Sequence, residues 1–103
     1  MKCNQVIAPQ TYVLGHGAWH GAWCWRRVAE VLRAAGHVVF MPTLTGLGQR
    51  IHLFRPDITI EDFATDVANV IEAEELRDVI LVGHSLAGGP ISVVAVSTVF
   101  TVR

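Results

Sequence analysis

The sequence has 103 residues, 51% of them hydrophobic and 17% charged, and its formal net charge is −1 at pH 7. This composition excludes a disordered chain, and the length suits a single domain over residues 1–103. With so little net charge the chain has no basic patch for a nucleic-acid backbone or a membrane surface, so we expect neither as a partner.

Cysteine spacing and hydropathy limit the possibilities further. Cys3 and Cys24 lack the CxxC or His-rich spacing of a disulfide framework or a zinc site, so we expect no metal. The apolar run after residues 1–5 is too short for a signal peptide, which makes a cytoplasmic protein the expectation. Residues 79–102 carry no formal charge over a length that would span a bilayer, but their glycines and Pro90 favour a strand, a turn and a helix.

Two strands and a helix are expected in the first part of the chain. Residues 11–14 are a short β-prone run that stops at the glycine loop 15–17. Apolar residues recur at helical spacing over residues 23–35, and Gly36 stands where a C-cap belongs, which predicts an amphipathic helix on a sheet. Residues 37–41 predict a second buried strand.

The next part of the chain predicts a loop, a helix and a third strand. Residues 43–56 form a Gly-containing loop that is longer than a simple connector. Thr59 followed by Asp62 resembles a capping box that opens a helix. Residues 79–82 are a third apolar strand, and the order β-α-β-α-β-turn-α implies parallel strands joined by right-handed crossovers. The expected fold class is therefore α/β. The apolar face of the second helix is predicted to carry Ile60, Phe63, Ala64, Val67, Val70 and Ile71.

The third strand leads into the most informative motif of the sequence, Gly83-His84-Ser85-Leu86-Ala87. An apolar strand that runs into this pattern forces the serine onto a strained strand-to-helix turn, the nucleophile elbow, which exposes its hydroxyl for attack on a carbonyl. Small residues are needed at positions 83 and 87, because a larger side chain would collide with the sharply folded backbone. A buried turn serine is the alternative interpretation of Ser85.

Acyl transfer also needs donors for the oxyanion of its tetrahedral intermediate, and two preorganised backbone N–H groups can supply them. One comes from the residue after the nucleophile, here Leu86, at a helix N-terminus. The other comes from the loop after an earlier strand, and residues 16–19 lie at that place. A dinucleotide-binding site is a weaker interpretation of this loop, because its glycines do not complete GxGxxG and Trp19 would obstruct a pyrophosphate.

Three segments together, residues 12–25, 42–50 and 81–89, resemble the α/β-hydrolase superfamily, and within it the small bacterial esterases related to plant methylesterases and hydroxynitrile lyases. The resemblance covers about residues 11–91. It implies a three-layer α/β sandwich of which this chain forms the N-terminal portion, ending just after the elbow helix. The partial parallel sheet would have its first strand between the second and the third.

The resemblance also implies roles for individual residues. Ser85 would be the nucleophile, and the backbone amides of Ala18 and Leu86 would form the oxyanion hole. The positions that support the two motifs would be His16, Gly17, Gly83, His84 and Ala87, with His16 structural. The substrate would be a small carboxylic ester, with no metal or organic cofactor. The lyase branch carries a Thr where this chain has Gly17, which favours an esterase.

The partners of the serine are the main gap. The family supplies its acid and then its histidine from loops after later strands, whereas residues 86–103 contain no His, Asp or Glu. We therefore expect this chain alone to be catalytically incomplete. The alternative is a non-catalytic chain, either a truncated product or a remnant that pairs with another polypeptide. His52 is the one upstream imidazole to consider as a substitute base, and a surface histidine is the favoured interpretation. His84 is expected to point away from Ser85.

Two expectations concern exposed apolar segments. The outer strands, residues 37–41 and 79–82, would lack sheet neighbours, so self-association through these open edges is expected. The β-branched content of residues 92–102 argues against a helix there, while their position after an elbow argues for one. A reading frame shifted after Ile91 would explain the conflict.

The three tryptophans near the first glycine loop have two interpretations. Trp19, Trp23 and Trp25 would line an acyl pocket, whereas packing in the core is an equally good account of the last two.

Overall fold

The computed structural model describes residues 8–96. Its three strands are β1 (Thr11–Gly15), β2 (Val38–Phe40) and β3 (Val79–Gly83). The α-helices are α1 (Arg26–Ala34), α2 (Ile60–Ala73) and α3 (Gly88–Val96), and the 3₁₀ helices are η1 (Ala22–Trp25), η2 (Gly48–Leu53) and η3 (Ser85–Ala87). Strands and helices alternate along the chain, as the sequence predicts.

The sheet has the order β2-β1-β3, and both pairings are parallel. Thr11 is in register with Val38 on one side and with Val79 on the other, and Gly15 is opposite Gly83. The predicted central position of β1 is confirmed. Because all three strands run the same way, the loops that follow them meet at the carboxyl edge of the sheet.

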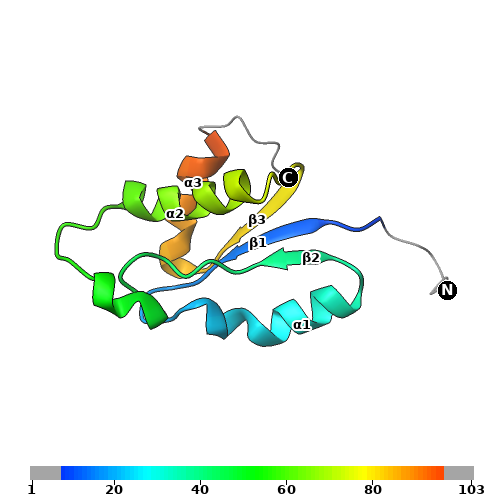
Figure 1. Ribbon diagram of the computed structural model, residues 1–103, viewed down its shortest axis with the longest axis horizontal. Coiled ribbons are helices and arrows are strands. Elements are labelled where there is room, and N and C mark those ends of the chain that lie inside the picture. The colour runs from blue at the N-terminus through cyan, green and yellow to red at the C-terminus, as the bar shows by residue number, and fades with distance from the viewer. Residues whose placement is uncertain (1–7, 97–103) are drawn as a thin grey trace.

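Helices cover both faces of this sheet, with α1 on one side and α2 and α3 on the other (Figure 1). Neighbouring residues of β1 serve the two faces in turn, since side chains alternate along a strand. Val13 belongs to the core on the side of α2 and α3, and Leu14 belongs to the core on the side of α1. The larger core contains Val13, Leu44, Ala64, Val67, Ile71, Val79 and Val94. The expected three-layer α/β sandwich is confirmed.

The boundaries of the first helix and the second strand differ from the expectation. Residues Ala22–Trp25 form a 3₁₀ turn, so the α-helix begins only at Arg26. Gly36 adopts a φ of +95°, the left-handed conformation expected of a C-cap glycine. The strand is shortened to Val38–Phe40, and Val38 is 45% exposed. The prediction of a buried second strand is wrong for this residue, because β2 lies at the edge of the sheet.

The N-terminus of α2 has the predicted capping box. The hydroxyl of Thr59 accepts a hydrogen bond from the Asp62 amide at 3.2 Å, and the Asp62 carboxylate accepts one from the Thr59 amide at 2.9 Å. The Asp62 amide also donates to the carbonyl of Thr59 at 3.1 Å, so the capping box supplements a backbone hydrogen bond there. Of the predicted apolar face, Ala64, Val67 and Ile71 are buried, whereas Ile60 is 39% exposed.

One backbone group at the β2 edge of the sheet is occupied by a side chain. Val38 donates its N–H to the carbonyl of Gln10 at 2.9 Å and so faces β1. The backbone groups of Val39 therefore point outward, since they alternate in direction along a strand. The outward carbonyl of Val39 accepts a 2.7 Å hydrogen bond from Nη2 of Arg33. This contact differs from the expectation that both edges are open.

No side chain among residues 8–96 covers the edge at β3 in this way. His84 donates its N–H to the carbonyl of Gly15 at 3.0 Å, so by the same alternation the backbone groups of Val79, Leu81 and Gly83 point away from β1. No strand among residues 8–96 pairs with this side of β3. The open edge is one strand of five residues without a charged side chain.

The described part of the chain has no helix that is long and apolar enough to cross a membrane.

Residues 43–56, expected to be a long loop, contain η2 and several exposed apolar side chains, among them Ile51 and Phe54. After the elbow, α3 continues to Val96. Residues 97–102 of the segment 92–102 lie outside the described residues. The hypothesis of a reading frame shifted after Ile91 concerns mainly these residues and stays a hypothesis.

Candidate active site

The strand β3 ends in a sharp turn at Ser85. His84 is still extended, with φ −109° and ψ 122°, whereas Ser85 adopts a φ of +57°. A non-glycine residue in this left-handed region costs about 1–3 kcal/mol and is often found at functional sites. The chain then enters η3 and α3 without interruption. Ser85 is exposed, so the predicted strained strand-to-helix turn is present, and its hydroxyl is open to an incoming molecule.

The loop after β1 lies directly against this turn. A Cβ added at Gly17 would be 2.9 Å from Nδ1 of His84 and 3.3 Å from Cβ of Ser85. The backbone carbonyl of Gly15 is also held by the amide of His84 at 3.0 Å. A side chain at position 17 would therefore displace His84 or Ser85, and the start of the loop after β1 is packed against the turn.

The two predicted oxyanion donors have no competing acceptor. Neither the amide of Ala18 nor that of Leu86 donates a hydrogen bond to any residue between 8 and 96. Leu86 lies in the first turn of the helical segment, where the helix dipole also favours negative charge. Their assignment as an oxyanion hole stays a prediction, as does the assignment of Ser85 as the nucleophile.

His16 holds the loop from inside the protein. Its side chain is fully buried, Nε2 accepts a hydrogen bond from the amide of Leu44 at 3.0 Å, and Nδ1 lies 2.9 Å from the carbonyl of Gly17. Since Nε2 accepts, the ring proton is on Nδ1 and is donated to Gly17. Burial lowers the pKa of His16, partly offset by the hydrogen bond to Gly17. His16 is thus a neutral structural residue in this geometry.

No other histidine of the described chain completes a catalytic pair with Ser85. Within residues 8–96 no imidazole hydrogen-bonds to the Ser85 hydroxyl. His52 is exposed on η2, as expected of a surface histidine. The ring of His84 lies 6.2 Å from that of His20, and both rings line a small cavity.

That cavity has a volume of about 260 Å³, and its other lining residues are Cys24, Trp25 and Val28. Burial raises the pKa of the Cys24 thiol, so the thiol is protonated at neutral pH. Nδ1 of His20 and Nε1 of Trp25 are buried without a hydrogen-bond partner among the described residues. Two of the residues that line this cavity, His20 and Trp25, therefore each carry a buried polar atom that no described residue satisfies.

The tryptophans divide between surface and core. Trp25 packs against the core on the α1 side, in agreement with one interpretation of it. Trp23 is 52% exposed, so core packing is wrong for this residue. Trp19 is 93% exposed and adopts a φ of +69°, a strained conformation next to Ala18 that no sequence pattern indicated.

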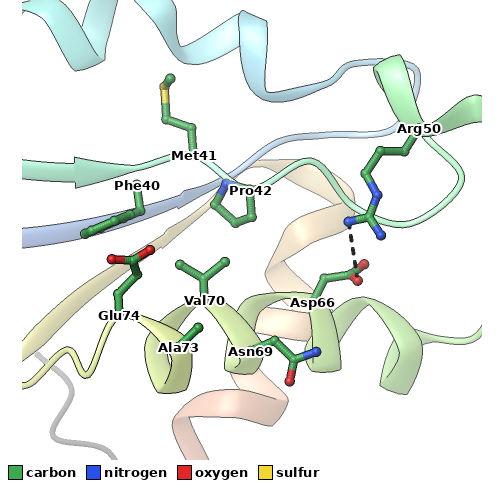
Figure 2. A pocket seen from close by; sticks show the side chains of 9 residues that line it. All are labelled: Phe40, Met41, Pro42, Arg50, Asp66, Asn69, Val70, Ala73 and Glu74. Atoms are coloured by element: carbon green, nitrogen blue, oxygen red, sulfur yellow. Dashed lines mark ion pairs between the residues drawn. The ribbon is translucent and has the colours of Figure 1, made fainter.

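A second, larger cavity of about 450 Å³ lies between the end of β2 and α2. None of the predicted site residues lines it (Figure 2). Among residues 8–96 no group of three or more His, Cys, Asp or Glu side chains is arranged to hold a metal ion.

Comparison with known proteins agrees with this geometry. The sequence profile described as the alpha/beta hydrolase family matches residues 12–102. The chain belongs to this family. The elbow at Ser85 and the loop at Gly17 both lie inside the matched part of this α/β-hydrolase chain.

Its relatives include esterases of bacteria and plants, as the motifs suggested. A carbendazim hydrolyzing esterase from Nocardioides sp. (strain SG-4G) is 58% identical over 84 residues, which cover 82% of this chain and 35% of that protein. Methylesterase 9 from Arabidopsis thaliana is 42% identical over 85 residues, covering 82% of this chain and 33% of the relative. This α/β-hydrolase chain thus spans about a third of the length of the relatives it matches.

A solved structure has the same arrangement of elements. An extracellular alpha/beta-hydrolase from a Paenibacillus species, described as sharing structural and functional homology with tobacco salicylic acid binding protein 2, superimposes with a TM-score of 0.82 at 34% identity. The alignment covers 92% of this chain and 38% of that one. The partial α/β-hydrolase fold is therefore confirmed.

Proposed function

We propose that Ser85 is the nucleophile of a serine esterase that acts on small carboxylic esters, completed by an acid and a histidine from outside this sequence. The observation that carries the proposal is the left-handed Ser85 packed against Gly17, with the amides of the neighbouring residues Ala18 and Leu86 bonded to no acceptor in the described chain. The names of the relatives, a carbendazim hydrolyzing esterase and a methylesterase, support a small ester as substrate.

The reaction would proceed in two halves. An imidazole removes the proton of the Ser85 hydroxyl as its oxygen attacks the ester carbonyl, and the negative charge that develops on the carbonyl oxygen is bound by the two amides. The imidazolium then protonates the leaving alcohol as its C–O bond breaks, which leaves an acyl group on Ser85. The same imidazole then takes a proton from a water molecule as its oxygen attacks this acyl group. The imidazolium returns that proton to Oγ of Ser85 as the acyl C–O bond breaks, which releases the acid and regenerates the serine and the neutral imidazole.

The proposal is tested by supplying the remaining two-thirds of a related esterase as a separate chain. We expect turnover of a short p-nitrophenyl ester that is lost in Ser85→Ala and kept in Ser92→Ala. Ser92 is a matched control because it is an exposed serine of the same helical segment, bonded to the carbonyl of Gly88 at 2.8 Å. A soluble assembled complex that neither hydrolyses the ester nor reacts with a fluorophosphonate would contradict the nucleophile assignment.

Without that complement, the chain is expected to hydrolyse the ester little faster than buffer. Ser85 then has no base, and a neutral serine hydroxyl is a weak nucleophile. Ester turnover by the isolated chain, abolished in Ser85→Ala, would show that a base exists within it, and His52→Ala would test the substitute named above.

The second candidate function is a non-catalytic chain that pairs with another polypeptide, or with itself, through β3. The open edge of that strand favours it, because unpaired backbone groups of Val79, Leu81 and Gly83 are a template for a further strand. The intact mass of the natural protein and the nucleotide sequence after the codon for Arg103 distinguish the two. An open reading frame that continues to an Asp and a late His would favour the esterase.

A further inference from the structure

We propose that Asp66 on α2 is a positioning residue for the loop that carries Ala18, acting through residues 43–45. The catalytic part of this inference rests on the proposed esterase function, whereas its structural part does not. Asp66 lies on α2, outside the elbow and the oxyanion loop, and it contacts neither Ser85 nor Ala18 directly in any hydrogen bond or ion pair of the described chain.

Both carboxylate oxygens of Asp66 bind the same residue. Oδ2 accepts a hydrogen bond from the amide of Thr45, and Oδ1 accepts one from the Thr45 hydroxyl, both at 2.6 Å. The Asp66 side chain is only 11% exposed. Hydrogen bonds to an ionised acceptor are about twice as strong as neutral ones, and two of them fix orientation as well as distance. Thr45 is therefore held firmly against α2.

Arg50 completes this attachment. Its guanidinium approaches Asp66 across the larger cavity, with Nη1 3.8 Å from Oδ1 (Figure 2). The same Nη1 donates a 3.0 Å hydrogen bond to the carbonyl of Thr43. Asp66 thus acts on both ends of the tripeptide 43–45, directly at Thr45 and through Arg50 at Thr43.

The two residues before Thr45 hold the loop after β1 at both its ends. The Thr43 hydroxyl accepts a hydrogen bond from the amide of Ala22 at 3.0 Å, and the Leu44 amide donates to Nε2 of His16 at 3.0 Å. Thr43 and Leu44 are buried. Ala18 lies between these two points of attachment, so the position of its amide depends on where residues 43–45 are placed.

A backbone donor stabilises an oxyanion only when it is aimed at the place where the charge develops, and the loss of one such donor reduces kcat by about 100-fold or more. A loop held at two points by a segment that is itself fixed to α2 is preorganised in this sense. The carboxylate of Asp66 is the group that fixes the segment, which makes it a positioning residue rather than a catalytic one.

The test compares three variants of the 103-residue chain by amide hydrogen exchange and NMR. In Asp66→Ala we expect the amides of Ala22 and Leu44 to exchange about tenfold faster, as the attachment is lost. Asp66→Asn should restore most of the protection, because its Oδ1 can accept from the Thr45 amide and its Nδ2 can donate to the Thr45 hydroxyl. Glu72→Ala, at an exposed position of the same helix, is the matched control and should change neither amide.

A uniform rise in exchange over the whole sheet in Asp66→Ala, or exchange equal to that of Glu72→Ala, would overturn the inference. If Asp66→Ala does not fold, Thr45→Val decides, since it removes only the hydroxyl bonded to Oδ1. Thr45→Ser keeps that hydroxyl and serves as its control. Faster exchange at Ala22 and Leu44 in Thr45→Val alone supports the inference, and equal exchange in both overturns it.

The complemented enzyme supplies the catalytic readout. We expect Asp66→Ala to lower kcat about tenfold with KM within about twofold, because a displaced donor is felt in the transition state, and Asp66→Asn to recover most of it. No ester turnover by the wild-type complex, with the exchange differences present, would defeat the esterase proposal and leave the structural role of Asp66 standing. Turnover that is the same in Asp66→Ala and Glu72→Ala would defeat the positioning role and leave the esterase proposal intact.

Discussion

Gly17 and Ser85 are in such close contact that a Cβ at position 17 would lie 3.3 Å from Cβ of the serine. They are far apart in the sequence, yet the parallel pairing of β1 and β3 brings the loops after both strands to one edge of the sheet. The serine of the elbow and the loop beside it therefore form one surface, and a change on either side is transmitted to the other.

This contact predicts a difference between two glycine-to-alanine substitutions. Gly17→Ala should displace the ring of His84 and the turn at Ser85, lowering the free energy of unfolding by about 1–3 kcal/mol and the activity of the complemented enzyme by about tenfold. Gly88→Ala is the control, because a Cβ there meets nothing within 4 Å and the residue is helical, with φ −58° and ψ −37°. It should stabilise the protein by about 0.5–1 kcal/mol. Equal effects of the two in denaturant unfolding and ester assays would contradict the packing described here.

The buried imidazole of His16 predicts a loss of stability in acid. Its folded pKa is lowered by burial, so as the pH falls below about 6.5 the unfolded chain takes up a proton that the folded chain refuses. The contribution of neutral His16 to the free energy of unfolding is complete above pH 7. It is lost toward lower pH, by at most about 1.4 kcal/mol per pH unit. Urea unfolding between pH 7.5 and pH 5 measures this slope.

His16→Gln should reduce that slope, since a glutamine carbonyl can still accept from the Leu44 amide but does not titrate. His52→Gln, at an exposed position, should leave the slope unchanged. A wild-type slope that His16→Gln does not alter would show that other groups cause the acid sensitivity.

The thiol of Cys24 should react slowly with disulfide reagents. Burial raises its pKa and so lowers the fraction of reactive thiolate at any pH below that value. In a Cys3→Ser background we expect the folded chain to react with Ellman's reagent at pH 8 about tenfold more slowly than the chain in denaturant. Equal rates would mean that the small cavity beside His84 is open to solvent.

The edges of the sheet predict where the isolated chain associates. Ile80→Lys places a charge in the open strand β3 and should shift the chain toward monomer in sedimentation at tens of micromolar, because a charge within an edge strand discourages pairing. Val38→Lys, at an exposed position of the opposite edge strand β2, should have little effect. A wild-type chain that is already a monodisperse monomer with a cooperative melt would refute the association. A shift toward monomer in Val38→Lys alone would show that the chains pair through β2 and not through β3.

Local patterns were predictable from the sequence, while contacts between distant segments were not. The capping box of Thr59 and Asp62, the cap at Gly36 and the strained turn at Ser85 each depend on a few neighbouring residues, and all three are present. The left-handed Trp19 escaped prediction because its conformation is imposed by the loop rather than preferred by tryptophan.

The contacts that organise the site were hidden for a different reason. Leu44 reaches His16 across 28 positions and Thr45 reaches Asp66 across 21. Such contacts depend on how the strands are ordered in the sheet, and a buried histidine or aspartate has no local signature. The sequence predicted a chemical role for residues 16–19 and 83–87, which stays a prediction, but it gave no sign of the segment that holds the first of these loops in place.

If this chain associates through its sheet, the hydrogen bond from Arg33 to the carbonyl of Val39 would affect how large the assembly becomes. A filament grows only if every molecule has two edges that can pair, because each added molecule must leave one edge free for the next. A molecule that can pair only through β3 has no free sheet edge left once β3 has paired with the β3 strand of a second molecule. In such a dimer only the two β2 edges would face solvent, and the assembly would not grow beyond two chains. The guanidinium of Arg33, at the opposite edge of the sheet, would thus favour a dimer over a fibre.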